Sequence, residues 1–262
     1  QYKESGPVTI RSLLTHSSGL PRESDFPYWT GPNFPFPTQA QLNARLSEQQ
    51  TLYPSSTYFQ YSNLGMSLLG EVVEKVSGQP YDKYVEENIL KPLRLNSTLT
   101  YIPKEEWGKK MAIGYGAIKR DGTRDKVNLF DTKGVKAAAG FTSTVGDLAR
   151  FASWQFRLLG NGGTEILKSS TLKEMHRVQW VDPDWKTYWG LGFGISQPDG
   201  ITIVGHGGSC PGYKTTLQLD PKEKMAYTVM INAGGESPEL FAKEIREIIA
   251  KIPKFKIVKK SD

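Results

Sequence analysis

The stretch Phe59-Gln60-Tyr61-Ser62-Asn63-Leu64-Gly65 stands at the start of a segment with helical periodicity. Gly78 and then Pro80 follow this segment, in the order that commonly ends a helix. Ser62 or Asn63 can cap the first turn, because both side chains accept hydrogen bonds from free backbone N–H groups. We therefore expect a helix over residues 61–77 that holds Tyr61 at its edge, with the phenol facing a cleft. The apolar residues with helical spacing are Leu64, Leu68, Leu69, Val72, Val73 and Val76.

A glycine-rich stretch lies far downstream, Gly205-His206-Gly207-Gly208-Ser209-Cys210-Pro211-Gly212-Tyr213, after the strand-like run Ile201–Val204. Glycines at the end of a strand let a substrate approach the backbone closely and leave N–H groups free to donate. A lone tyrosine or histidine is more simply explained by packing. The two polar motifs together make a candidate site.

A Tyr-x-Asn motif followed at long range by Lys-x-Gly or His-x-Gly on a strand resembles the pattern of the penicillin-recognising serine hydrolases. The sequence is similar to their class C β-lactamase-like group, which includes esterases and D-amino-acid peptidases. The resemblance extends from about Val8 to about Ile249. Three further blocks carry it, in the family's order: residues 9–21 (TIRSLLTHSSGLP), 91–95 (KPLRL) and 139–149 (AGFTSTVGDLA).

The resemblance implies an α/β (α+β) fold, in which an antiparallel sheet flanked by helices adjoins a mostly helical region. The hydrophobic pattern agrees, because it changes from helical to alternating near residue 191. We expect one region over residues 1–190, which carries Tyr61, and a second over residues 191–262, which carries His206. The expected strands are Leu191–Ser196, Ile201–Val204, Thr215–Asp220 and Met225–Asn232, followed by a closing helix over Pro238–Ile252.

In relatives, the nucleophile is the serine of a Ser-x-x-Lys motif that precedes all these blocks. No such motif precedes Tyr61 in this sequence. We therefore expect the chain to lack the N-terminal strands and the nucleophile helix, which an upstream segment or a second chain would supply. We also expect an exposed sheet edge. One Ser-x-x-Lys occurs at Ser170 to Lys173, after Tyr61, where Ser169 or Ser170 is better explained as a helix cap.

Site roles follow from the resemblance. Tyr61 is the expected general base and acid, and Asn63 is expected to bind the substrate amide and the upstream lysine. His206 takes the position of a lysine in β-lactamases. A phenol needs nearby positive charge to ionise at neutral pH, which the upstream lysine or a protonated His206 would provide. The strand edge adds Gly207 and Gly208 as substrate-binding residues and the N–H of Ser209 as an oxyanion donor.

The histidine at position 206 indicates the class of substrate. A neutral imidazole lacks the permanent charge that holds a β-lactam carboxylate, so we expect ester or peptide substrates. Residues 21–40 form a long loop with five prolines and several aromatic residues, and we expect this loop to shape the substrate pocket. The alternative to a hydrolase is a non-catalytic module that binds acyl or peptide ligands in the same cleft.

The amino-acid composition indicates the class of protein. The 262 residues are 38% hydrophobic and 23% charged, as in ordinary globular proteins. The single cysteine, Cys210, excludes an internal disulfide, and we expect it to lie in a loop without a nucleophilic role. The net charge of +6 comes partly from lysines near the C-terminus, at positions 251, 254, 256, 259 and 260.

No nucleic-acid-binding signature and no apolar run of membrane-spanning length accompanies these lysines. We expect no cofactor, no metal, no nucleic-acid partner and no membrane span. The compartment is unknown from the sequence, although the resemblance favours a periplasmic or secreted protein.

Overall fold

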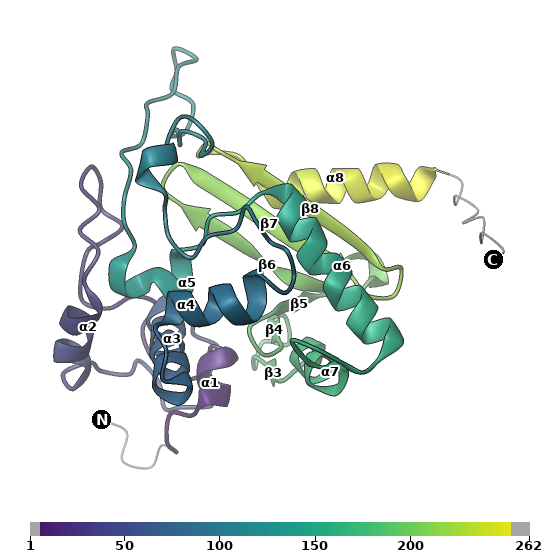
Figure 1. Cartoon of the computed structure of the whole chain (residues 1–262), viewed down its shortest axis with the longest axis horizontal. Coiled ribbons are helices and arrows are strands. Elements are labelled where there is room, and N and C mark those ends of the chain that lie inside the picture. The colour runs from purple at the N-terminus through teal and green to yellow at the C-terminus, as the bar shows by residue number, and fades with distance from the viewer. Residues whose placement is uncertain (1–5, 253–262) are drawn as a thin grey trace.

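The structure is a computed structural model and describes residues 6–252 (Figure 1). The helices are α1 (Ile10–Leu14), α2 (Gln39–Leu46), α3 (Asn63–Ser77), α4 (Tyr81–Val85), α5 (Lys136–Ala139), α6 (Val145–Asn161), α7 (Ser169–His176) and α8 (Pro238–Lys251). Shorter turns are a π-helical turn at Glu86–Leu90 and 3-10 turns at Lys104–Glu106, Lys133–Val135 and Pro198–Gly200. The strands are β1 (Thr164–Glu165), β2 (Leu167–Lys168), β3 (Trp180–Val181), β4 (Tyr188–Trp189), β5 (Gly194–Ser196), β6 (Ile203–Cys210), β7 (Tyr213–Asp220) and β8 (Met225–Ile231).

Strands β3 to β8 form one antiparallel sheet in simple sequence order. This meander, with helices beside it, confirms the expected fold class. The expected strand Leu191–Ser196 is shorter than predicted, since β5 begins at Gly194. The strand expected to end at Val204 instead continues through the glycine-rich motif to Cys210, so Cys210 lies in β6 and not in a loop.

The sheet has an open edge at β8, whose one partner strand among residues 6–252 is β7. The sheet begins at β3, so within the described residues no strand from the preceding helical region joins it. The two short strands β3 and β4 precede residue 191. The division into residues 1–190 and 191–262 stays a prediction.

Helices α1 to α5 gather on one side of the molecule, at the left of Figure 1, and α6 and α8 lie against the long strands. Helix α8 buries Ala242 and Arg246 on its sheet-facing side, where Arg246 donates to Gln218 of β7. Its other apolar residues remain exposed at Leu240, Phe241, Ile245 and Ile248. No helix in residues 6–252 has the length and apolar character to cross a bilayer.

Helix α3 confirms the prediction made from its periodicity. The Ser62 hydroxyl caps it by accepting from the N–H of Gly65 at 2.9 Å. Gly78 ends it in the left-handed conformation (φ 68°), which glycine adopts without steric cost. Close packing fixes the helix, since a Cβ on Gly70 would lie 2.6 Å from the Cβ of Ala137 in α5.

The loop at residues 21–40 is not a lid. Tyr28, Phe34 and Phe36 are each at most 8% exposed and pack with Phe130 into a buried aromatic cluster. The aromatic residues of this loop form a hydrophobic cluster of their own. Their packed rings exclude water from the inside of the loop. These three rings belong to the core, and the expectation that the loop shapes the substrate pocket stays a prediction.

Sequence signals for a helix cap were also misleading at α7. Ser169 and Ser170 lie inside the helix, whose N-cap is Lys168, and no side chain provides a cap hydrogen bond. The Ser169 hydroxyl is buried and has no hydrogen-bond partner among the described residues. Ser170 is exposed, and the expectation that it is not the nucleophile stays a prediction.

Candidate active site

The two motifs meet in space. Tyr61 precedes the first turn of α3, His206 lies on β6, and the Tyr61 hydroxyl lies 3.3 Å from Nε2 of His206. Tyr61 is half-buried, whereas His206 is exposed on the strand. The structure thus brings the expected acid–base residue beside the histidine of the His-x-Gly motif.

The hydrogen bonds of His206 fix its tautomer. Its Nδ1 is bonded to the carbonyl oxygen of Gly207, which can only accept, so Nδ1 carries the proton. Nε2 of the neutral ring is then an acceptor, and the Tyr61 hydroxyl donates to it. Although His206 is solvent-exposed, the protein around its ring lowers its pKa by desolvation. The imidazole is therefore neutral at neutral pH and does not supply the positive charge that Tyr61 needs.

The phenol of Tyr61 has a raised pKa. Burial is the main cause, the nearby Arg22 opposes it, and Glu23 and Cys210 add to it. The guanidinium carbon of Arg22 lies 5.1 Å from the centroid of the Tyr61 ring. At neutral pH the phenol is protonated in this arrangement, so Tyr61 could act as a base only with a proton acceptor or a further cation nearby.

His16 contacts both Tyr61 and its neighbour Ser62. Its Nδ1 accepts from the backbone N–H of Ser62 at 3.1 Å, and its ring lies 4.2 Å from the ring of Tyr61. The side chain is 1% exposed, and burial lowers its pKa to about 3, with His206 and Arg22 adding to the effect. His16 is therefore a neutral hydrogen-bond acceptor in the fold.

Trp189 of β4 is a residue that sequence reasoning missed. Its ring lies 4.9 Å from His16 and 5.7 Å from His206, edge to face in both cases, and 5.2 Å from Phe59. Its indole ring therefore contacts residues of both motif-bearing regions. The only signal in the sequence was an aromatic pair at positions 188 and 189, which is common in strands.

Asn63 is buried, and its side-chain Nδ2 donates to Oε1 of Glu23 at 2.7 Å. Glu23 also accepts from the hydroxyl of Tyr28 and from Nε of Arg22. Neither Arg22 nor Glu23 was expected at the site. They follow the stretch Gly19-Leu20-Pro21, and no motif marks them.

Glycines shape both faces of β6. Successive residues on a strand point to opposite faces, so His206 and Gly208 share the face that Tyr61 approaches. On the opposite face, a Cβ on Gly207 would lie 2.8 Å from Oε1 of Glu239 in α8. The side chain of Ser209 shares this second face, away from Tyr61. Its side chain is thus a bystander, and the role of its N–H group stays a prediction.

The motif has one free backbone edge. Strand β5 pairs with β6 only as far as Gly205, whereas β7 pairs with it from Val204 to Cys210. From His206 onward, the edge of β6 that β5 leaves has no partner strand within the described residues. Such an edge leaves backbone groups able to bond a ligand.

Cys210 ends β6 and packs against the aromatic cluster of the 21–40 loop. Burial raises its pKa to about 11, and Glu23 adds to the shift. A thiolate is the reactive form of cysteine, so this thiol is poorly suited to act as a nucleophile. Within residues 6–252, no group of three or more His, Cys, Asp or Glu side chains is arranged to hold a metal ion.

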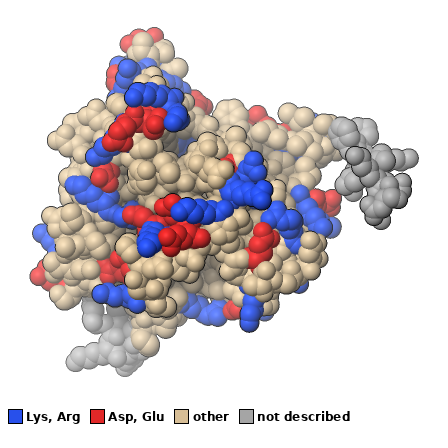
Figure 2. Space-filling view, in the orientation of Figure 1, with Lys and Arg blue, Asp and Glu red and all other residues tan. Residues whose placement is uncertain are grey.

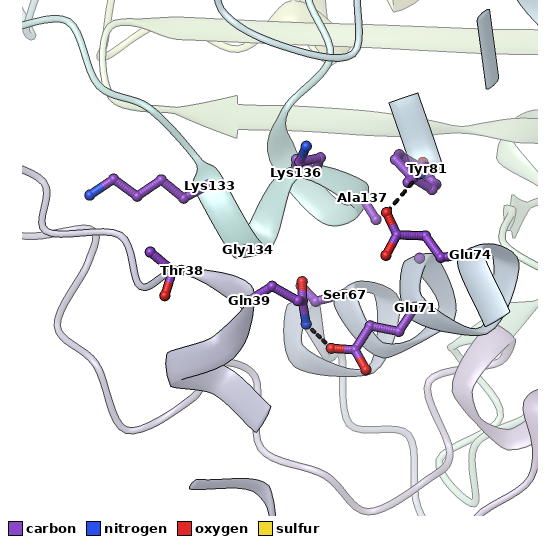
Figure 3. A pocket seen from close by; sticks show the side chains of 11 residues that line it. Thr38, Gln39, Ser67, Glu71, Glu74, Tyr81, Lys133, Gly134, Lys136 and Ala137 are labelled. Atoms are coloured by element: carbon purple, nitrogen blue, oxygen red, sulfur yellow. Dashed lines mark hydrogen bonds between the residues drawn. The ribbon is translucent and has the colours of Figure 1, made fainter. Parts of the chain in front are cut away.

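A cavity of about 280 Å³ lies elsewhere, between α3, the start of α2 and the Lys133–Ala139 segment (Figure 3). Two carboxylates of its lining have protein partners. Glu71 accepts from Gln39, and Glu74 accepts from the backbone N–H of Tyr81 at 2.7 Å. Neither Tyr61 nor His206 lines it, so it is separate from the candidate site.

Charged side chains are mixed on the face drawn in Figure 2, where basic and acidic groups alternate. Oppositely charged side chains also form ion pairs, such as Lys136–Asp82 at 2.5 Å and Lys91–Glu86 at 2.9 Å. The lysines at positions 254, 256, 259 and 260 lie outside the described residues.

A family model described as Beta-lactamase matches residues 1–250. The chain belongs to the β-lactamase family. Beta-lactamase-like protein 2 of Dictyostelium discoideum is 27% identical over 252 residues, which are 95% of this chain and 44% of that protein. This membership confirms the resemblance to penicillin-recognising serine hydrolases.

Two solved structures share the fold of this chain. The octameric penicillin-binding protein homologue of Pyrococcus abyssi superposes with a TM-score of 0.79 and 29% identity, covering 93% of this chain and 56% of that one. A D-stereospecific amidohydrolase of Streptomyces sp. superposes with a TM-score of 0.70 and 26% identity, covering 86% and 68%. The chain spans about half the length of the curated relatives it matches.

Proposed function

We propose that this chain is part of a serine hydrolase that cleaves ester or amide (peptide-like) bonds through an acyl-enzyme. The serine of a Ser-x-x-Lys motif outside this chain attacks the substrate carbonyl. The observation that carries the proposal is the 3.3 Å contact between the Tyr61 hydroxyl and His206 Nε2 on the open part of β6. Membership of the β-lactamase family supports it.

In this mechanism Tyr61 transfers the proton. The phenol first gives up its own proton, either to Nε2 of His206 or to the lysine of the Ser-x-x-Lys motif. The resulting phenolate accepts the proton of the attacking serine as a general base and returns it to the leaving group as a general acid. Asn63 bonds the substrate amide. The N–H of Ser209, on the edge lined by Gly207 and Gly208, stabilises the developing oxyanion.

The proposed substrates carry an ester or amide group and need no carboxylate beside His206. A neutral imidazole donates and accepts hydrogen bonds but has no charge with which to hold an anion. The lowered pKa of His206 supports this choice. An amidohydrolase among the structural relatives supports the amide class.

A further segment completes the site in this proposal, either upstream in the same protein or on a second chain. The open edge of β8 and the exposed apolar residues of α8 are consistent with such a segment. An exposed strand edge together with apolar surface is an aggregation hazard unless it is covered.

The test is labelling of the full-length protein with a fluorophosphonate probe, followed by denaturing mass spectrometry. The probe phosphonylates an activated serine and releases fluoride. We expect one labelled serine, in a Ser-x-x-Lys sequence, and slower labelling of the Tyr61→Phe variant. Absence of labelling in a folded full-length protein would contradict the hydrolase and favour the non-catalytic binding module.

A further inference from the structure

The segment Pro21–Glu23 is docked onto the start of α3. The Ser62 hydroxyl donates to the carbonyl of Pro21 at 2.7 Å, and the N–H of Asn63 donates to the carbonyl of Arg22 at 2.8 Å. N–H groups at a helix start have no partner within the helix, and the Arg22 carbonyl satisfies those of Asn63 and Leu64 from another part of the chain. The position of the Tyr61–Asn63 motif therefore depends on this segment.

The Glu23 carboxylate determines which way the Asn63 amide points. Its side chain is 23% exposed and accepts from Asn63 Nδ2 at 2.7 Å, from Arg22 Nε at 3.3 Å and from the Tyr28 hydroxyl. A carboxylate has no proton to give, so it can face only the NH₂ side of the amide. Asn63 Oδ1 is thereby turned away from Glu23, and it accepts no hydrogen bond from the described residues.

Arg22 places a permanent positive charge over Tyr61. Its guanidinium carbon is 5.1 Å from the ring centroid, and Nε is held by Glu23. The other titratable groups around the phenol are Cys210, His206 and His16, in addition to Glu23. The pKa shifts of these two histidines and of the thiol leave all three uncharged at neutral pH.

We propose that Arg22 and Glu23 are a positioning pair for the candidate site: Glu23 orients the Asn63 amide, and Arg22 stabilises the phenolate form of Tyr61. The inference rests on the proposed function, since that function gives Tyr61 and Asn63 their roles. Arg22 replaces His206 as the source of charge within this chain. Glu23 opposes this effect on Tyr61 while holding the arginine in place.

The first test is titration of Tyr61 by NMR, with ¹³C-labelled tyrosine ring carbons and assignment by comparison with Tyr61→Phe. Arg22→Gln should raise the pKa of Tyr61, and Glu23→Gln should lower it. Arg45→Gln is the matched control, because Arg45 lies 4.7 Å over the ring of Phe26, away from the site, and should leave Tyr61 unchanged. Loosening of the site alone would move the pKa toward its ordinary value in both variants. Shifts of the same sign, or no shifts, would overturn the proposal.

The second test exchanges donor and acceptor at the amide. Asn63→Asp places two carboxylates together and should lower the unfolding midpoint. Adding Glu23→Gln restores one donor and should recover most of that loss. In the full-length enzyme, the double variant should remain ten- to a hundredfold lower in kcat/KM, on the order expected for misplaced groups. Full recovery of turnover, or no recovery of stability, would contradict the orienting role.

Neither the titration of Tyr61 nor the comparison of unfolding midpoints depends on turnover. Opposite pKa shifts in a protein that resists the fluorophosphonate probe would uphold the pair and reject the hydrolase. If the enzyme is labelled but neither substitution shifts the pKa of Tyr61, the hydrolase is upheld and the positioning pair is rejected.

Discussion

The hydroxyl of Tyr61 lies 3.3 Å from Nε2 of His206, although the two residues are 145 positions apart in the sequence. The docked segment Pro21–Glu23 holds the first residue, and strand β6 holds the second. Because the Nδ1 proton of His206 is bonded to the Gly207 carbonyl, the Tyr61 proton has one defined acceptor. This geometry is what a shared proton transfer requires.

Tyr61→Phe removes that proton and leaves the ring. We expect turnover of an activated ester by the full-length protein to fall by about 10²- to 10⁴-fold, the usual contribution of a general acid–base group. The unfolding midpoint should change little, because the ring contacts with His16 and Trp189 persist. Ester hydrolysis at the wild-type rate in this variant would exclude the mechanism.

Acid should destabilise the fold through His16. Its pKa is about 3 in the folded protein and near 6.5 when unfolded, so the unfolded state binds the extra proton. Stability is fully present above pH 6.5 and falls by about 1.4 kcal/mol per pH unit between 6.5 and 3. His176, with a pKa lowered to about 4 by burial, adds a second proton over most of that range.

Urea unfolding at several pH values measures this slope. In His16→Asn, the amide oxygen can accept from the N–H of Ser62 in place of Nδ1, and the slope below pH 6.5 should fall by about one proton. His176→Asn is the matched control for the other proton. An unchanged slope in both variants would show that carboxylates, not these histidines, govern acid unfolding.

Helix α3, the meander and the proximity of Tyr61 to His206 could be predicted from the sequence. Each depends on local periodicity or on a motif of known spacing. Arg22 and Glu23 could not be foreseen. Their roles arise from contacts with residues about 40 positions away, which no local pattern encodes. Trp189 was missed for the same reason.

Errors arose where one local pattern fits two structures. The stretch Thr144–Asp147 has the sequence of a capping box with Asp in place of Glu, but only half of the box forms: the Thr144 hydroxyl accepts from the N–H of Asp147. The Asp147 carboxylate instead accepts from the Ser97 N–H at 2.8 Å and the Thr98 hydroxyl at 2.9 Å.

Cys210 should react slowly. With its pKa raised to about 11 by burial, little thiolate is present at pH 8. We expect iodoacetamide to modify the native protein much more slowly than the urea-unfolded one, as followed by mass spectrometry. Cys210→Ser should retain the fluorophosphonate labelling of the full-length enzyme. Rapid native modification together with loss of labelling in the serine variant would restore a role for the thiol.

Helix α3 depends on a close contact that only glycine permits at position 70. In Gly70→Ala the new methyl group would lie 2.6 Å from the Cβ of Ala137, so α3 and α5 must separate. Overpacking of this kind costs about 1–3 kcal/mol, more than the roughly 1 kcal/mol gained from helix propensity. Gly146→Ala is the matched control, because its nearest neighbour is Thr144 Oγ1 at 3.8 Å. Thermal unfolding should show Gly70→Ala melting below the wild type and Gly146→Ala at or above it. Equal melting of both variants would mean that the α3–α5 contact yields without cost.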